Sequence, residues 1–144
     1  FRKCKLEGRF IIIEETDKEK ITATLIIAEA DILSANSIKD KLEKKSIQWS
    51  SIYKLYYDAL HELVESFMEF ERVKIQNHQC LFAYLCEKYP ELELNWEFFE
   101  KVRTKRNGIN YYGKPVTYDD WKGVELQFIL YINKLKQEIK KKLK

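Results

Sequence analysis

The sequence predicts an all-α fold, a five-helix antiparallel bundle with a short N-terminal arm. Four glycines and two prolines in 144 residues favour long helices. Apolar residues recur at spacings of three and four, which is the period of a helix with one buried face. At 45% hydrophobic and 14% aromatic residues, the chain has enough apolar mass for one sizeable core. We therefore expect a single domain over 1–144, with 1–15 as the arm.

The first helix is predicted to follow the arm. The apolar run Phe10-Ile11-Ile12-Ile13 is too short for its period to separate a strand from an extended packing segment, and no convincing sheet is expected. Thr16 and Glu19 have the spacing of a capping box, in which two side chains satisfy free amides at a helix start. The helix is expected to reach about Asn36. Its buried face steps by four, three and four through Ile21, Leu25, Ala28 and Ile32.

The second and third helices are predicted over about Trp49–Glu71 and Gln76–Tyr89. The second has an apolar stripe wide enough to pack against two neighbours, so we expect it to be central. The third ends before Pro90, because the residue preceding a proline is disfavoured in helical geometry. The stripe of the second helix comprises Ile52, Tyr53, Tyr56, Ala59, Leu60, Leu63, Val64, Phe67 and Phe70.

The fourth helix is predicted from about Asn95 to Gly113, and the fifth from Thr117 almost to the C-terminus. Gly108 weakens the fourth helix by about 1 kcal/mol relative to alanine. Either a neighbour packs closely there or the helix loosens. Thr117 and Asp120 have the spacing of a cap for the fifth helix. Its long regular stripe completes the five helices, and short connections favour antiparallel neighbours.

The segment Lys101–Gly113 carries the polar residues that helix packing does not explain. At about 100° per residue, Arg106 falls within the apolar arc that holds Val102. A buried unpaired charge costs several kcal/mol, so Arg106 must be paired, at an interface or in a site. A carboxylate such as Asp58 is one candidate partner, and a phosphate is the other. The adjoining arc carries Arg103, Asn107 and Asn110, with Tyr111 at its edge.

Charge and motifs exclude several functions. The net charge is +3, and the last eleven residues alone hold six lysines and one glutamate, or +5, which leaves −2 for the rest. Any basic attraction to nucleic acid is therefore local to 101–106 and to the tail, and the lysines of the tail are interpreted first as a solvated helix end favoured by the helix dipole. No phosphate-binding glycine loop, nucleophile motif or metal-ligand spacing occurs, so we expect no cofactor and no metal. His61 and His78 are interpreted as structural histidines.

The cysteines and the hydropathy suggest an intracellular protein. Cys4, Cys80 and Cys86 make an odd number without a CxxC pair, which predicts neither a disulfide framework nor a zinc site. No apolar run approaches the ~20 residues of a membrane span. We therefore expect a cytoplasmic protein without a membrane partner.

The Arg106-Asn107 pair followed by Asn110-Tyr111-Tyr112-Gly113, late in the fourth of five helices, resembles the signature region of the HEPN domain family. The similarity extends over most of the chain, although the motifs outside the Arg-Asn pair are loose. The other motifs are Gly8-Arg9-Phe10 in the arm, Ala28-Glu29-Ala30 in the first helix, Tyr57-Asp58-Ala59-Leu60 in the second and His78 at the start of the third.

The resemblance implies a homodimer whose two Arg-Asn faces meet at a cleft. Many members of the family are metal-independent RNases, with an arginine that holds the scissile phosphate and a histidine that transfers protons. In those enzymes four to six residues separate the arginine from the histidine. Other members bind nucleotides or pair with a minimal nucleotidyltransferase as toxin and antitoxin.

This chain departs from the family pattern, because Tyr111, Tyr112 and Gly113 occupy the three positions where the histidine would stand. Three hypotheses follow. The first is a nucleotide- or RNA-binding module, with Arg103, Arg106, Asn107 and Asn110 as phosphate ligands. The second is an active RNase in which Arg106, Asn107 and Tyr111 are catalytic and the tyrosine replaces histidine. The third is a structural homodimer in which Arg106 forms a buried salt bridge.

Overall fold

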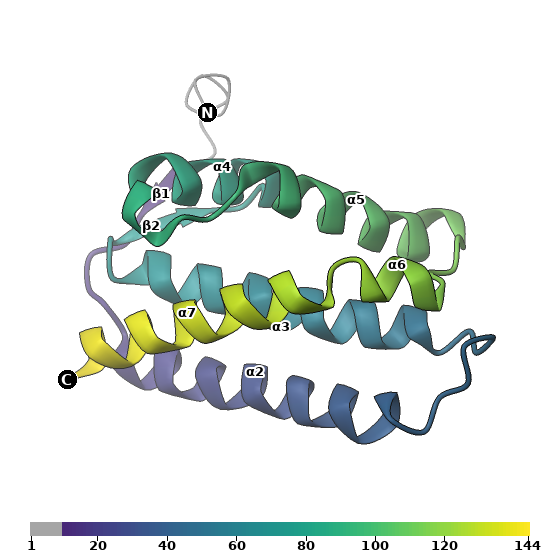
Figure 1. Cartoon of the computed structure of the whole chain (residues 1–144). Helices are drawn as coiled ribbons and strands as arrows, with labels where there is room; N and C mark the ends of the chain where they lie inside the picture. The colour runs from purple at the N-terminus through teal and green to yellow at the C-terminus, as the bar shows by residue number, and fades with distance from the viewer. Residues whose placement is uncertain (1–9) are drawn as a thin grey trace.

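The computed structural model describes residues 10–144, and it is mainly helical (Figure 1). Gly8 and Arg9 of the expected arm, and Cys4, lie outside the described residues. The elements follow in the order β1 (Phe10–Ile12), α2 (Lys18–Lys39), α3 (Trp49–Glu69), β2 (Val73–Ile75), α4 (His78–Lys88), the 3-10 helix η1 (Pro90–Leu92), α5 (Trp96–Tyr112), α6 (Tyr118–Lys122) and α7 (Glu125–Leu143).

Helix α3 is the centre of the bundle, as its wide apolar stripe predicts. It packs most extensively against α2 and next against α7, and it also contacts α4, α5 and α6. Figure 1 shows α2 and α5 on opposite sides of α3, with α7 crossing in front of it. The arrangement confirms a helical bundle built around the second predicted helix.

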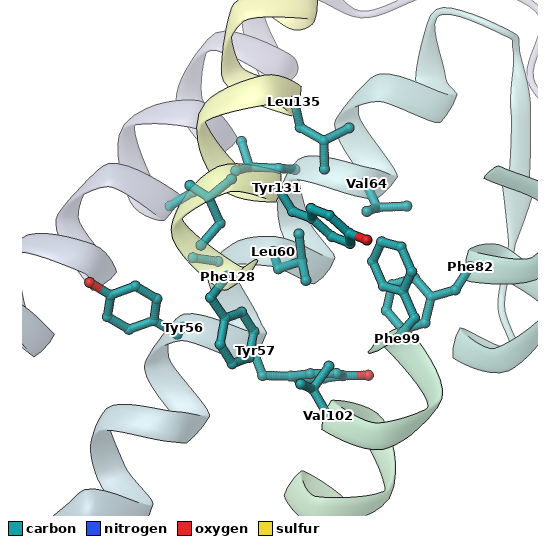
Figure 2. Packing of buried hydrophobic residues seen from close by; sticks show 14 of the residues in the cluster. Tyr56, Tyr57, Leu60, Val64, Phe82, Phe99, Val102, Phe128, Tyr131 and Leu135 are labelled. Atoms are coloured by element: carbon teal, nitrogen blue, oxygen red, sulfur yellow. The ribbon is translucent and has the colours of Figure 1, made fainter. Parts of the chain in front are cut away.

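Aromatic rings fill much of the core between these helices. Trp121 is fully buried, and its ring lies 4.7 Å from that of Tyr56 and 5.9 Å from that of Phe128, measured between centroids. On the other side of α3, Phe82 of α4 stacks on Phe99 of α5 at 4.6 Å. Figure 2 shows these two rings beside each other. Stacked and edge-on rings of this kind contribute about 0.5–1.5 kcal/mol each beyond the area they bury.

The expectation of no sheet is wrong for a short segment. β1 pairs with β2 as an antiparallel two-stranded sheet, in which Phe10 faces Ile75 and Ile12 faces Val73. The first strand therefore falls within the predicted arm. Pairing between segments more than sixty residues apart leaves no periodic signal in a three-residue run, so the sequence pattern could not reveal it.

Two helix ends also differ from prediction. The N-cap of α2 is Asp17, whose carboxylate accepts from the Lys20 amide at 3.0 Å, whereas the Thr16 hydroxyl donates to the Glu69 carbonyl. The predicted last helix is divided into α6 and α7 at Gly123, whose amide bonds back to the carbonyls of α6. The cap at Thr117 is confirmed as a complete capping box with Asp120.

Helix α2 is long and apolar enough, by length and composition alone, to cross a membrane. The expectation that no segment reaches this length is therefore wrong, although core helices pass the same test. One face of α2, with Ile21, Leu25, Ala28 and Ala35, is buried in the bundle. The prediction of no membrane partner stays a prediction.

The cysteines depart from the expectation as well. Cys80 near the start of α4 is disulfide-bonded, and Cys86 is a free, half-buried thiol on the same helix. An odd cysteine count does not exclude one disulfide bond, so the inference from that count was too strong. The cytoplasmic location remains a prediction.

Candidate phosphate-binding cleft

Helix caps fix the two elements that bound the cleft. The Asn95 side chain accepts from the amides of Glu97 and Phe98 and starts α5, while the left-handed Gly113 ends it. The Asn77 side chain accepts from the Cys80 amide at 3.0 Å and starts α4. The first turn of α4 therefore faces the later turns of α5 across a cleft of about 220 Å³. Its lining residues are Asn77, His78, Gln79, Arg103, Arg106, Asn107 and Tyr111.

Arg106 is held loosely at the wall of this cleft. One guanidinium nitrogen, Nη2, lies 3.6 Å from Oδ1 of Asp58, beyond hydrogen-bond distance. The guanidinium carbon lies 5.4 Å from the centre of the Tyr57 ring, which is a cation–π contact. The buried Nε has no hydrogen-bond partner among the described residues. Arg106 is therefore partly paired, with unused donor capacity.

Arg103, one turn earlier, is paired with a carboxylate on its own helix. Its Nε and Nη2 donate to the two carboxylate oxygens of Glu100 at 3.1 and 3.0 Å. This two-point pairing within α5 neutralises the guanidinium. The two arginines that line the cleft thus differ, because Arg103 already has a carboxylate and Arg106 has only a distant one.

Two histidines lie behind Arg106. The rings of His61 in α3 and His78 in α4 stack with their centroids 3.7 Å apart. The Tyr57 hydroxyl and Nδ1 of His78 share a hydrogen bond of 2.9 Å. Nε2 of His61 approaches Glu65 to 3.1 Å, but the angles do not form a hydrogen bond and the atom is unpartnered. His78 also lines the cleft, so the stack extends from the core to its wall.

Burial and neighbouring cations keep both imidazoles neutral. Burial, His78 and Arg106 together lower the pKa of His61 to about 3. Burial, followed by Arg106 and Arg103, lowers the pKa of His78 below its usual value. Burial raises the pKa of the Tyr57 hydroxyl, which stays protonated. At neutral pH the cleft therefore presents the neutral ring of His78 beside the guanidiniums of Arg103 and Arg106.

Helix α3 contributes no residue to the lining of the cleft, but two of its carboxyl groups, Asp58 beside Arg106 and Glu62, have raised pKa values. Burial raises the pKa of Asp58 despite the opposing effect of Arg106, and burial with Asp31 and Asp58 raises the pKa of Glu62 to about 7. The Glu62 Oε2 atom is buried without a hydrogen-bond partner among the described residues. Within residues 10–144, no three His, Cys, Asp or Glu side chains converge on a position that could hold a metal.

The structure brings together most of the residues that the sequence selects. Arg103, Arg106, Asn107 and Tyr111 line the cleft, whereas Asn110 is exposed and is not part of its lining. Arg103, Asn107 and Tyr111 also line a broader hollow on the outer face of α5. Tyr111 is 70% exposed and thus free to contact a ligand from solvent.

Sequence reasoning missed the histidines. His61 continues the inward row of α3 one turn after Tyr57 and one before Glu65, a spacing of four that indicates a half-buried position. That signal was present in the sequence. The approach of His78 to the same place depends on the packing of α4 against α3, which no local pattern specifies.

Gly108 matches neither expected explanation. A Cβ atom at this position would meet Cβ of Lys114 at 3.9 Å, an ordinary contact, and α5 continues unbroken to Tyr112. No neighbour requires a glycine here. The residue leaves the outer face of α5 open where it borders the hollow.

Comparison of the chain with family models, with curated proteins and with solved structures gives no match. The geometry of the cleft therefore carries the functional argument.

Proposed function

We propose that the chain is a HEPN-type module that binds a nucleotide or RNA through a phosphate held at Arg106. One observation supports this more than any other. Arg106 stands at the wall of an open cleft with a 3.6 Å carboxylate contact and no hydrogen bond from its side chain among the described residues. Two oxygens of a phosphate can accept hydrogen bonds from the planar fork of a guanidinium.

The other lining residues suit the same ligand. The Asn107 amide and the Tyr111 hydroxyl can donate to phosphate or sugar oxygens. The neutral imidazole of His78 adds a further polar group without a second positive charge. The hollow outside α5, lined by Tyr111 and Tyr112, gives room for the base or for the next nucleotide of a strand.

Binding to a fluorescent single-stranded RNA and to ATP tests the proposal. Arg106→Ala should weaken binding of at least one probe by roughly tenfold to a hundredfold, since a charge-assisted hydrogen bond contributes about 1.5–3 kcal/mol. Lys88→Ala is the matched control, because it removes one exposed charge at the far end of α4. It should leave the affinity within about twofold. Unchanged affinity in a folded Arg106→Ala protein would reject the proposal.

A second candidate function is metal-independent RNA cleavage. One finding favours it, namely that His78 lines the cleft beside Arg106 although α5 itself lacks a histidine. In such a reaction a base takes the proton of the ribose 2′-hydroxyl, the oxygen attacks phosphorus, and the bond to the 5′ oxygen breaks to leave a 2′,3′-cyclic phosphate. A neutral imidazole can accept that proton at pH 7. Tyr111 offers a phenol hydroxyl, which is a poorer proton acceptor than a neutral imidazole.

Incubation with single-stranded RNA in EDTA decides between binding and cleavage. Cleavage that disappears in His78→Gln and in Arg106→Ala but persists in Tyr111→Phe would support His78 as the proton-transfer group. Loss in Tyr111→Phe alone would support the tyrosine instead. Intact RNA with all proteins would restrict the chain to binding.

We also propose a protein partner for such a module. A minimal nucleotidyltransferase encoded beside this chain would place both in a toxin and antitoxin pair. Co-expression followed by copurification is the direct measurement, with Arg106→Ala testing whether the cleft takes part.

A further inference from the structure

Helix α2 is apolar on two opposite faces, and the bundle covers one of them. On the outer face Ile26, Ile27 and Leu33 are 61%, 53% and 70% exposed. A contiguous exposed apolar patch marks a candidate interaction site. The outer face of α2 is therefore a candidate for contact with a partner.

The exposed residues of α2 form one straight seam. Each residue of a helix is rotated by about 100° from the one before it, and we measure this rotation from Ala30. Between Ala23 and Ser37, the exposed residues within about 60° of Ala30 are all uncharged. The buried positions Ile21 and Ala28 fall near the opposite side. The seam comprises Ala23, Ile26, Ile27, Ala30, Leu33, Ser34 and Ser37, all exposed.

The charges that end this seam have opposite signs. Glu19 lies on the seam in the first turn, and Lys41 follows two residues after the helix ends at Lys39; both are exposed. Lys20 and Asp40 flank the seam at its two ends, and their charges are also of opposite sign. A helix with a negative position at one end and a positive position at the other complements a second copy that runs in the opposite direction.

We propose that α2 packs antiparallel against α2 of a second copy of this chain, with a two-fold axis at Ala30. Residues equidistant from Ala30 then face each other. Ile27 meets Leu33 of the second copy, and Glu19 meets Lys41. Small Ala30 lies at the axis, where it allows the two helix backbones to approach closely. Because the axis is two-fold, each contact occurs twice.

The rim of this interface is compatible with the same arrangement. The mirrored positions nearest the axis are Glu29 and Asp31, which point sideways from the seam. Glu29 carries two lysines, since Lys136 and Lys140 of α7 lie 3.4 and 3.6 Å from its carboxylate. The flank that faces Asp31 of the second copy is thus net positive, and it favours the pairing.

This dimer is independent of the ligand proposed for the cleft. Figure 1 places α2 and α5 on opposite sides of α3. The two clefts would therefore stay open on the outside of the dimer. The arrangement differs from one in which the two Arg106 faces meet.

Sedimentation equilibrium of the whole chain from about 1 to 100 μM measures the association. The expected mass of the wild type is that of two chains. Ala30→Glu places two carboxylates at the axis and should weaken the dimer by about 100-fold. Leu126→Glu is the matched control, because it replaces a 69% exposed leucine of α7 outside the seam. It should leave the association unchanged.

A charge exchange tests the direction of pairing. Glu19→Lys alone should weaken the dimer by about threefold to tenfold. Glu19→Lys combined with Lys41→Glu should restore it, because each helix end again meets the opposite sign. Circular dichroism confirms that the variants remain helical. Failure of the double exchange to restore association, with both proteins folded, would contradict the antiparallel register.

Two results would overturn the proposal. One is a wild type that is monomeric across the whole concentration range. The other is a dimer that persists in Ala30→Glu and is lost in Arg106→Ala, which would place the interface at the cleft. A monomer that sediments with phosphatidylglycerol vesicles, and loses this binding in Ala30→Glu, would assign the face to a membrane surface instead.

Discussion

Buried polar groups are paired to different extents on the two sides of α3. On the side of α7 most of these groups are paired. The Tyr56 hydroxyl donates to Asn36 at 2.6 Å, and the Trp121 indole donates to Glu125 at 3.2 Å. Glu125 also receives two lysines, which help to lower its pKa against the effect of burial. This side has the pattern of a structural core, in which each paired group stabilises its neighbours.

The side facing α4 and α5 leaves polar groups unpaired. Of the four buried, unpartnered side-chain atoms among the described residues, two belong to His61 and Arg106 on this side, and a third belongs to Glu62, whose pKa is raised by burial and then by Asp31 of α2. The fourth is the Tyr53 hydroxyl in the core. An unpaired buried polar atom costs about 1–3 kcal/mol, so Nε of Arg106 at the wall of the cleft and Nε2 of His61 behind it indicate a region arranged for something other than stability.

The largest expected effect is on the α7 side. Trp121→Ala removes a fully buried ring that contacts Tyr53, Tyr56 and Phe128, and it should lower the free energy of unfolding by about 3–5 kcal/mol. Urea denaturation at pH 7 measures it. The control is Tyr111→Ala at the cleft, where a largely exposed ring should change stability by less than about 0.5 kcal/mol. Equal losses of unfolding free energy in the two variants would contradict the proposed difference between the two sides of α3.

The contrast also explains what the sequence could predict. Helix existence follows local rules, so α3 was placed from its stripe and α6 from the cap at Thr117. Periodicity likewise marks Arg106 as anomalous, and Asp58, named as one example of a possible partner, lies 3.6 Å from it in the structure. The nature of the cleft depends on His78, which reaches Arg106 through the packing of separate helices. Such contacts leave no mark on the local sequence.

The second prediction concerns acid stability on the cleft side. His61 titrates near pH 6.5 in the unfolded chain and near pH 3 in the folded one. Between these values the unfolded state binds more protons, so stability falls as the pH drops from about 6.5 to 3. The stability lost through His61 as the pH falls over this range is on the order of a few kcal/mol.

Replacing His61 by phenylalanine isolates this effect. His61→Phe keeps a ring against His78 and Phe82, and it removes the titrating group. Its free energy of unfolding should decline less steeply than that of the wild type between pH 6 and 4, as measured by urea denaturation at each pH. The carboxylates titrate in both proteins and cancel in the difference. Parallel pH profiles would show that His61 is not held neutral.

The smallest effect is expected at Arg106 itself. Arg106→Leu removes a half-buried guanidinium that has an unpartnered Nε and a 3.6 Å contact with Asp58. Asp58 has a side chain 42% exposed, so its charge stays hydrated after the change. The free energy of unfolding should therefore stay within about 1 kcal/mol of the wild type or rise.

Thermal and urea unfolding of Arg106→Leu measure that change, and Trp121→Ala serves as the reference for a structural residue. A loss above about 2 kcal/mol would show that the pairing with Asp58 stabilises the bundle, as the hypothesis of a structural salt bridge requires. Retained stability together with lost affinity for RNA or ATP would separate the two roles. An arginine that the bundle does not need for stability, and that a ligand does need, is a binding residue.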